Sequence, residues 1–297
     1  MRNPILVLSL FTGVAAAQVP PLPSDADRPK ARESGIEGRL GVGVTSQYFF
    51  RGIAQATSGL IVQPWIELGY DLLDSDDGVQ DLRIVVGQWD SVHRGRTAPG
   101  GAVWYESQNY VGLEAKIADR FFLATRYNTY SSPNVFGLLN GLTNIEELAF
   151  YGRFDDKGVF FDDLSLNPTA TLAFELNNSR DSFLGQGKEG TYLELGVAPQ
   201  FDAGMIGDSP VTISVPAKFG LSLHNYYERP AGGNDEFFGF FQVGAVASMP
   251  LNYLPARLGP WHGDVGLHLL LLGDNNKDRN NGHGAELIFT VGMSTMF

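Results

Sequence analysis

The chain has 297 residues, a formal net charge of −12, 36 glycines and no cysteine. The missing cysteine excludes disulfides and thiolate metal sites. The acidic balance argues against nucleic acid as a partner, because no basic field would attract its phosphate groups.

The N-terminal stretch is typical of an export signal. Arg2 precedes an apolar run over 5–14, and the three alanines at 15–17 are the small residues that a signal peptidase accepts. The run is too short to span a membrane as a helix. We predict a signal peptide over 1–17, with a buried N-terminal helix as the alternative. A flexible periplasmic tail should follow over 18–38, which is rich in Pro, Asp, Arg and Ser.

From residue 39 to the end, segments of alternating polarity follow one another without a linker. A two-residue period indicates β-strands with one apolar face. Their spacing is about that of ~10-residue strands and their connections in a barrel. The whole of 39–297 is therefore expected to form one β domain. The twelve segments are 39–47, 60–71, 81–91, 103–117, 120–128, 145–154, 166–176, 192–201, 211–222, 236–248, 264–271 and 286–297.

Alternation does not say which face points inward, but three features favour lipid over a dry core. The second face mixes Glu, Arg and Lys with Gly, Ser and Thr, which suits a wet lumen. Strands of ~10–12 residues match a tilted membrane crossing, whereas soluble strands average ~5–6. Aromatic residues gather near segment ends, as in the girdles at the lipid–water interface. We predict an all-β fold, a closed antiparallel transmembrane β-barrel of about twelve strands, with a soluble barrel as the alternative. The girdle residues would be Tyr48, Tyr70, Tyr127, Phe174, Phe201, Phe219 and Phe297.

An even number of strands puts both termini at one end, and export places that end in the periplasm. The chain ends on Phe297. A closing strand with a terminal aromatic residue resembles the signal by which the barrel-assembly machinery recognises bacterial outer-membrane barrels. The expected location is therefore the outer membrane, and the expected partners are its lipid and that machinery.

Several motifs in the first third of the chain resemble one family. They are V-T-S-Q-Y-F-F-R-G-I at 44–53, Q-P at 63–64, V-G-Q-W-D-S at 86–91, and Y-E at 105–106 with Y-V-G at 110–112. This part, roughly 44–113, is similar to the TorF-type family of outer-membrane porins. It departs from the family at Gln47, where Asp is usual, and the C-terminal half does not align. The resemblance implies an outer-membrane barrel with a transport role.

Charged side chains of the second face would line the lumen. Their mixed signs allow either a transverse field that orients solutes or pairing that fills a narrow barrel. If the lumen is open, its acidity should favour cations modestly. Arg51 is expected in a loop at the pore mouth, or paired with a loop carboxylate. The predicted pore-lining residues are Glu67, Arg83, Glu106, Glu114, Lys116, Arg126, Glu147, Arg153, Glu175, Glu194, Lys218, His268 and Glu286.

The sequence offers little for catalysis. Its five histidines lack metal-ligand spacing. The segment 274–282 resembles a calcium loop without the required sixth Gly and twelfth Glu. His268 with Ser248 or Ser294 would imitate a barrel-edge hydrolase pair. We predict no metal, no cofactor and no enzymatic activity.

The predicted function is a passive outer-membrane channel for small polar solutes. The first alternative is a plugged structural or adhesive barrel. The second is an outer-membrane lipid hydrolase, which requires a serine within hydrogen-bond reach of a histidine.

Overall fold

The computed structural model describes residues 35–75, 78–93, 104–131, 145–161, 164–178, 189–229 and 234–297. The predicted signal peptide over 1–17 and most of the predicted tail over 18–38 lie outside these ranges. The first strand begins at Ile36, rather than at the expected residue 39. No helix among the described residues is both long and apolar enough to cross a membrane.

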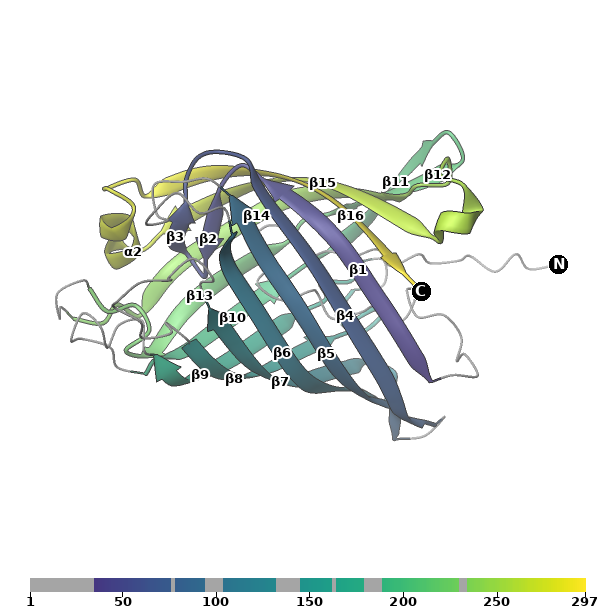
Figure 1. Ribbon diagram of the computed structural model, residues 1–297, viewed down its shortest axis with the longest axis horizontal. Helices are drawn as coiled ribbons and strands as arrows, with labels where there is room; N and C mark the ends of the chain where they lie inside the picture. The colour runs from purple at the N-terminus through teal and green to yellow at the C-terminus, as the bar shows by residue number, and fades with distance from the viewer. Residues whose placement is uncertain are drawn as a thin grey trace.

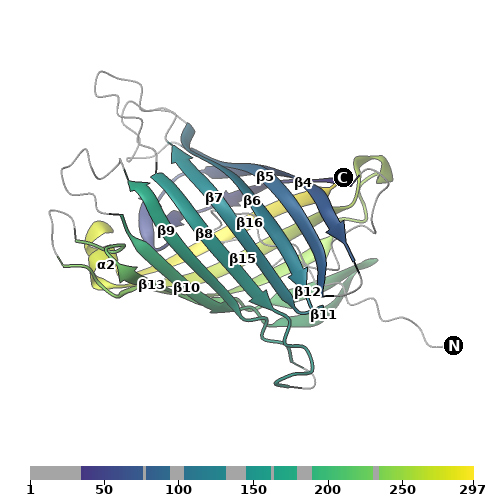
Figure 2. The same cartoon turned by 90° about the horizontal axis from the view of Figure 1, so that it is seen from below.

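Twelve antiparallel strands close into a ring, as predicted (Figures 1 and 2). Each pairs with the next along the chain, and the last pairs with the first, from Arg39 opposite Met296 to Thr45 opposite Thr290. The closed ring leaves no unpaired edge, which a sheet in lipid requires. The strands are β1 (Ile36–Thr45), β4 (Ile61–Asp74), β5 (Val79–His93), β6 (Trp104–Ile117), β7 (Phe121–Ser131), β8 (Ile145–Phe154), β9 (Thr169–Asn178), β10 (Thr191–Val197), β13 (Ala217–His224), β14 (Phe238–Pro250), β15 (Trp261–Leu272) and β16 (Ala285–Met296).

A hairpin extends the ring at one end. Its strands, β11 (Gln200–Ile206) and β12 (Ser209–Ser214), follow β10 and precede β13 after short breaks. Each break contains a proline, Pro199 or Pro216, which has no N–H for the ladder. The eighth and ninth predicted segments are therefore each split in two.

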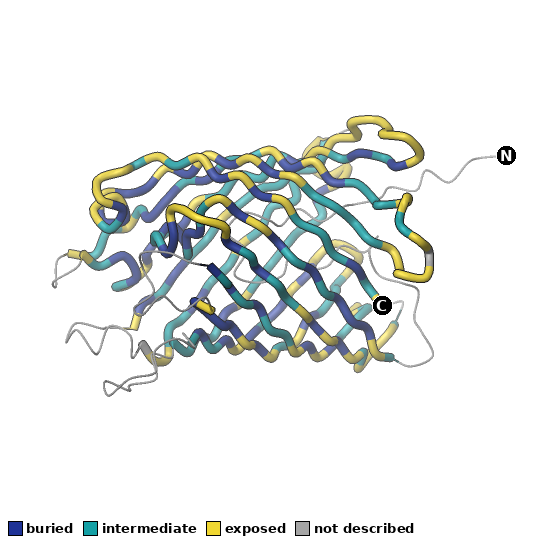
Figure 3. The backbone as a smooth tube through the Cα atoms, turned by 45° about the horizontal axis from the view of Figure 1, so that its top comes forward, coloured by how far each residue is buried: buried dark blue, intermediate teal, exposed yellow. Residues whose placement is uncertain are grey.

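The apolar face of the barrel is its exposed, outer face. Exposed and buried residues alternate along the strands (Figure 3). Leu195 and Leu269 are 45% and 40% exposed, whereas His268, the next residue along β15, is 2% exposed. This alternation repeats around the ring, so the apolar side chains form an outer band suited to acyl chains. The chain is a membrane-spanning β-barrel.

The start of β1 and the end of β16 lie side by side at one end of the barrel (Figure 1). Turns at this end include Ala118 and Asp119, both with positive φ, and the connection from β8 to β9. In that connection Asp156 is buried and accepts hydrogen bonds from the Ser165 hydroxyl and from the N–H groups of Leu166 and Asn167. Burial works against ionisation, but these hydrogen bonds outweigh it and lower the pKa of Asp156.

At the opposite end, two loops fall wholly within the described residues. Residues 46–60, between β1 and β4, contain the short strands β2 (Tyr48–Phe50) and β3 (Ile53–Ala56). The loop after β15 contains the short helix α2 (Asp274–Arg279), whose first N–H groups are bound by Glu236. The segment that resembles a calcium loop is thus mostly helical. No cluster of metal-ligating side chains occurs within the described ranges.

Candidate functional site: the barrel lumen

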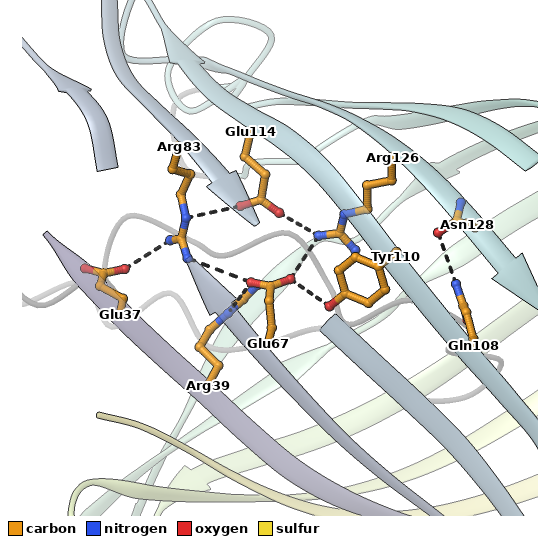
Figure 4. A network of polar contacts seen from close by, with 9 residues as sticks. All are labelled: Glu37, Arg39, Glu67, Arg83, Gln108, Tyr110, Glu114, Arg126 and Asn128. Atoms are coloured by element: carbon orange, nitrogen blue, oxygen red, sulfur yellow. Dashed lines mark hydrogen bonds and ion pairs between the residues drawn. The ribbon is translucent and has the colours of Figure 1, made fainter. Parts of the chain in front are cut away.

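One wall of the lumen carries a network of arginine and glutamate side chains (Figure 4). Glu67 lies at its centre and binds Arg39 through Nε at 3.0 Å and through Nη2. It also accepts hydrogen bonds from the Tyr110 hydroxyl at 2.8 Å and from Arg126 at 3.3 Å. Two further carboxylates complete the network, Glu114 at 2.5 Å from Arg126 and Glu37 at 3.0 Å from Arg83.

The charges of the network balance, and its side chains are buried. It holds three arginines and three glutamates, from the neighbouring strands β1, β4, β5, β6 and β7. Arg39 and Arg126 are 0% exposed and Glu67 is 1% exposed. Side chains that line an open, water-filled pore would be accessible to solvent, whereas these are not. A buried cluster of this kind depends on all its members, because removing one leaves an uncompensated charge.

The loop over 46–60, called the inward loop below, turns into the lumen. It starts between β1 and β4, and its tip at Arg51 contacts Glu147 on β8 and Tyr192 on β10. Counted around the twelve-stranded ring, β9 is the strand opposite β1, and β8 and β10 flank it. The loop therefore spans the full width of the barrel.

Polar groups of the inward loop bind carboxylates on three strands. The Tyr48 hydroxyl donates to Glu106 on β6 at 3.0 Å. Arg51 binds both oxygens of Glu147, at 2.5 and 2.9 Å. Gln47 donates to Glu286 on β16 at 3.1 Å. These contacts are distributed around the wall, so they fix the loop across the lumen rather than along one side.

A buried apolar cluster, called the apolar seat below, packs against the inward loop. Phe49, 2% exposed, belongs to a buried cluster with inward side chains from β10, β14, β15 and β16, namely Tyr192, Phe240, Leu270 and Ile288. These residues interrupt the polar face of their strands. Their burial against the loop explains why apolar side chains point into a lumen that is otherwise polar.

The structure corrects two expectations for this loop. Tyr48, expected in the outer girdle, is 2% exposed inside the barrel and packs on Trp89 with ring centroids 5.5 Å apart. Arg51 does not pair with a loop carboxylate, and its expected place at the pore mouth stays a prediction. It is buried and pairs with Glu147 of the wall. Tyr70, Tyr127, Phe201, Phe219 and Phe297 are exposed, as a girdle requires.

The predicted lining residues all lie on the inner face or at its margins. Seven are buried: Glu67, Arg83, Glu106, Glu114, Arg126, Glu147 and His268. The other six are half-buried: Lys116, Arg153, Glu175, Glu194, Lys218 and Glu286. Among these six, Glu194 pairs with Lys218 at 3.0 Å, Lys116 with Asp119 at 3.5 Å, and Arg153 lies over the Phe122 ring. Glu175 accepts from the Gly190 N–H at 2.8 Å. Whether these residues line a conducting path stays a prediction.

Some central residues were absent from the predicted set. Glu37 falls within the predicted tail, and Arg39 was assigned to the polar face without a site role. The pair Tyr226 and Tyr227 lies in the loop after β13, where two adjacent aromatic residues were the only available signal. Both are buried beside Arg51, and the Tyr227 hydroxyl donates to the Arg51 carbonyl at 2.9 Å.

The proposed hydrolase pairs of His268 do not form. His268 lies opposite Gly244 and Ile288, whereas Ser248 and Ser294 lie opposite other residues, four and six positions along their strands. At ~3.3 Å per residue, these serines are more than ~12 Å away along the strand. A different pair does meet the requirement.

That pair lies on β5. The Ser91 hydroxyl and Nδ1 of His93 are 3.2 Å apart. Both residues are buried, at 0% and 1% exposed, and His93 packs against Tyr105 with ring centroids 4.7 Å apart. Nε2 of His93 has no hydrogen-bond partner among the described residues. The pair thus lacks the carboxylate that orients the histidine of a catalytic triad.

No family model matches the chain, and no curated protein matches it. Its resemblance to the TorF-type family therefore stays a prediction. Solved structures with a similar fold include an outer-membrane channel from Pseudomonas putida F1, with 9% identity and a TM-score of 0.49 over 91% of this chain and 99% of that one. The β domain of the Bordetella autotransporter BrkA has 12% identity and a TM-score of 0.43 over 88% and 98%. LpxR from Salmonella typhimurium has 9% identity and a TM-score of 0.43 over 87% and 100%. Scores of this size carry no argument about function.

Proposed function

We propose that the chain is an outer-membrane channel for small polar solutes, and that the inward loop holds it closed in this conformation. The observation that carries the proposal is the path of the loop across the lumen, fixed by the bidentate contact between Arg51 and Glu147. The barrel wall also supports the proposal, because its inner face is polar and charged while its outer face is apolar. Such a wall is suited to water-soluble cargo once the loop moves away.

Planar-bilayer conductance tests this proposal. We would compare the wild type with a variant in which residues 48–56 are replaced by a short Gly/Ser linker. The matched control shortens the tip of the β11–β12 hairpin, residues 203–208, which is exposed and lies beyond the ring (Figure 1). The loop variant should conduct at voltages where the wild type and the control do not. If the loop variant folds and never conducts, the channel function is wrong.

Two alternative functions are each supported by one specific observation. The buried, neutral network around Glu67 is what a plugged structural barrel would contain, and that function predicts no conductance for either variant. The contact between Ser91 and His93 is the one that a lipid hydrolase needs. A hydrolase would release fatty acid from outer-membrane lipid and lose that activity in Ser91→Ala, with the fold unchanged.

A further inference from the structure

The side chain of Arg51 occupies a compact pocket in the barrel wall. The Glu147 carboxylate faces the guanidinium group, and Nη1 also donates to the Tyr226 hydroxyl at 3.0 Å. The Tyr192 ring lies beside the group, with 4.3 Å between its centroid and Cζ, and the Tyr226 ring centroid is 5.5 Å away. One carboxylate and two aromatic faces form the usual environment of an organic cation.

The groups around the guanidinium lie outside the inward loop: Glu147 on β8, Tyr192 on β10 and Tyr226 in the loop after β13. Glu147 is held by the Tyr130 hydroxyl at 3.1 Å and by the Asn128 amide at 3.4 Å, both from β7. The Tyr192 and Tyr226 rings pack on each other with centroids 4.9 Å apart. The inward loop also packs on these residues: Phe50 lies on Tyr130 with ring centroids 5.3 Å apart, and Phe49 shares a buried cluster with Tyr192 and Tyr226. Glu147 and Tyr192 lie on strands of the ring, so a wall carboxylate without its cation and one aromatic face remain if the loop leaves.

The backbone at the loop tip disfavours an arginine. Arg51 and Gly52 have φ of 47° and 81° between the paired residues Phe50 and Ile53, which is the pattern of a type I′ turn. Gly, Asn or Asp is usual at both central positions, and a left-handed non-glycine residue costs roughly 1–3 kcal/mol. The arginine is therefore explained by its side-chain contacts rather than by the turn.

We propose that this pocket is a binding site for the guanidinium group of a small solute, and that Arg51 occupies it as an internal ligand when the channel is closed. A planar guanidinium matches the two Glu147 oxygens, whereas an alkylammonium group makes a single-point contact. A solute with this group displaces Arg51 and with it the loop tip, so binding favours the open state. This inference rests on the proposed channel function.

Binding of agmatine, a small guanidinium compound, tests the site without requiring a current. Isothermal titration would use the full-length folded protein in detergent, with urea as the uncharged probe. The Arg51→Ala variant should bind agmatine roughly tenfold or more tightly than the wild type, because the competing side chain is gone. Urea should bind neither protein, and binding of cadaverine, a diammonium compound, should be weaker than that of agmatine.

Two double variants locate the binding. Adding Glu147→Gln to Arg51→Ala should abolish agmatine binding. Adding Glu286→Gln instead, a wall carboxylate on β16 that also contacts the loop, should preserve it. Far-UV circular dichroism would confirm that both proteins fold. The proposal fails if folded Arg51→Ala binds no agmatine, or if both double variants lose binding equally. Binding without conductance in the loop-replaced protein would refute the channel and keep the site. Conductance without binding would refute the site alone.

Discussion

Replacing Glu67 with Gln tests whether the lumen network is as dry as its geometry indicates. Glu67 accepts hydrogen bonds from Arg39, Arg126 and Tyr110, and is 1% exposed. The amide keeps the shape of the side chain but removes its charge, leaving three buried arginines with two carboxylates. Breaking a buried ion cluster in this way costs about 3–5 kcal/mol. We expect the free energy of unfolding to fall by that amount.

The assay is urea unfolding of the barrel in lipid vesicles, followed by tryptophan fluorescence. Glu194→Gln is the matched control, because Glu194 also pairs with a cation, Lys218, at 3.0 Å, but the two side chains are 21% and 27% exposed. A partly solvated pair contributes about 1 kcal/mol or less. If both variants lose the same small amount, water reaches Glu67 and the lumen is open at that level, contrary to our account.

Three further predictions concern the outer face, the β8–β9 connection and the C-terminus. Leu267 is 49% exposed on the apolar face, and Leu267→Arg should lower the free energy of unfolding in vesicles by about 2–4 kcal/mol. The control Leu258→Arg, in the β14–β15 connection, should change it by about 0–1 kcal/mol. Equal effects would contradict the assignment of Leu267 to the lipid-facing side. Because the pKa of Asp156 is lowered, its carboxylate stabilises the folded protein above the unfolded pKa of ~3.9. This stabilisation is lost as the pH falls through the folded pKa. Between pH 5 and pH 3 (~two units), the free energy of unfolding should therefore fall in the wild type by an amount that is missing in Asp156→Asn. Equal falls in the two proteins would refute this prediction. Phe297→Ala should reduce the folded protein recovered from the outer membrane, and Met296→Ala should not; normal recovery of both would exclude the terminal ring as an assembly signal.

Much of the fold follows from the sequence, because a two-residue period determines which side chains share a face. The ring of twelve strands and the outward position of Leu195 and Leu269 were predicted on that basis and are confirmed. The pattern is least regular where Phe240 and Ile288 put apolar side chains on the polar face. These exceptions form the seat of the inward loop. Their role depends on the path of that loop, which cannot be predicted from a two-residue period.

The candidate site was predicted only in part. Strand alternation places Glu67 and Arg126 on the inner face, but not beside each other. Glu67 is 28 residues from Arg39 and 59 from Arg126 in the sequence, and their contact depends on the stagger of the strands around the ring. Arg51 was located in a loop, and its reach to Glu147, 96 residues away, depends on that loop turning inward.

Thiol reactivity within β15 tests the closed lumen most directly, because the chain has no cysteine of its own. Leu270→Cys places a thiol in the apolar seat, where Leu270 is 1% exposed, and Leu269→Cys places one on the outer face. A small charged methanethiosulfonate reagent would be applied to each protein in lipid vesicles, with and without residues 48–56. We predict that neither thiol reacts in the intact barrel, and that only Cys at position 270 reacts once the loop is removed. Fast labelling of position 270 in the intact protein would contradict the account.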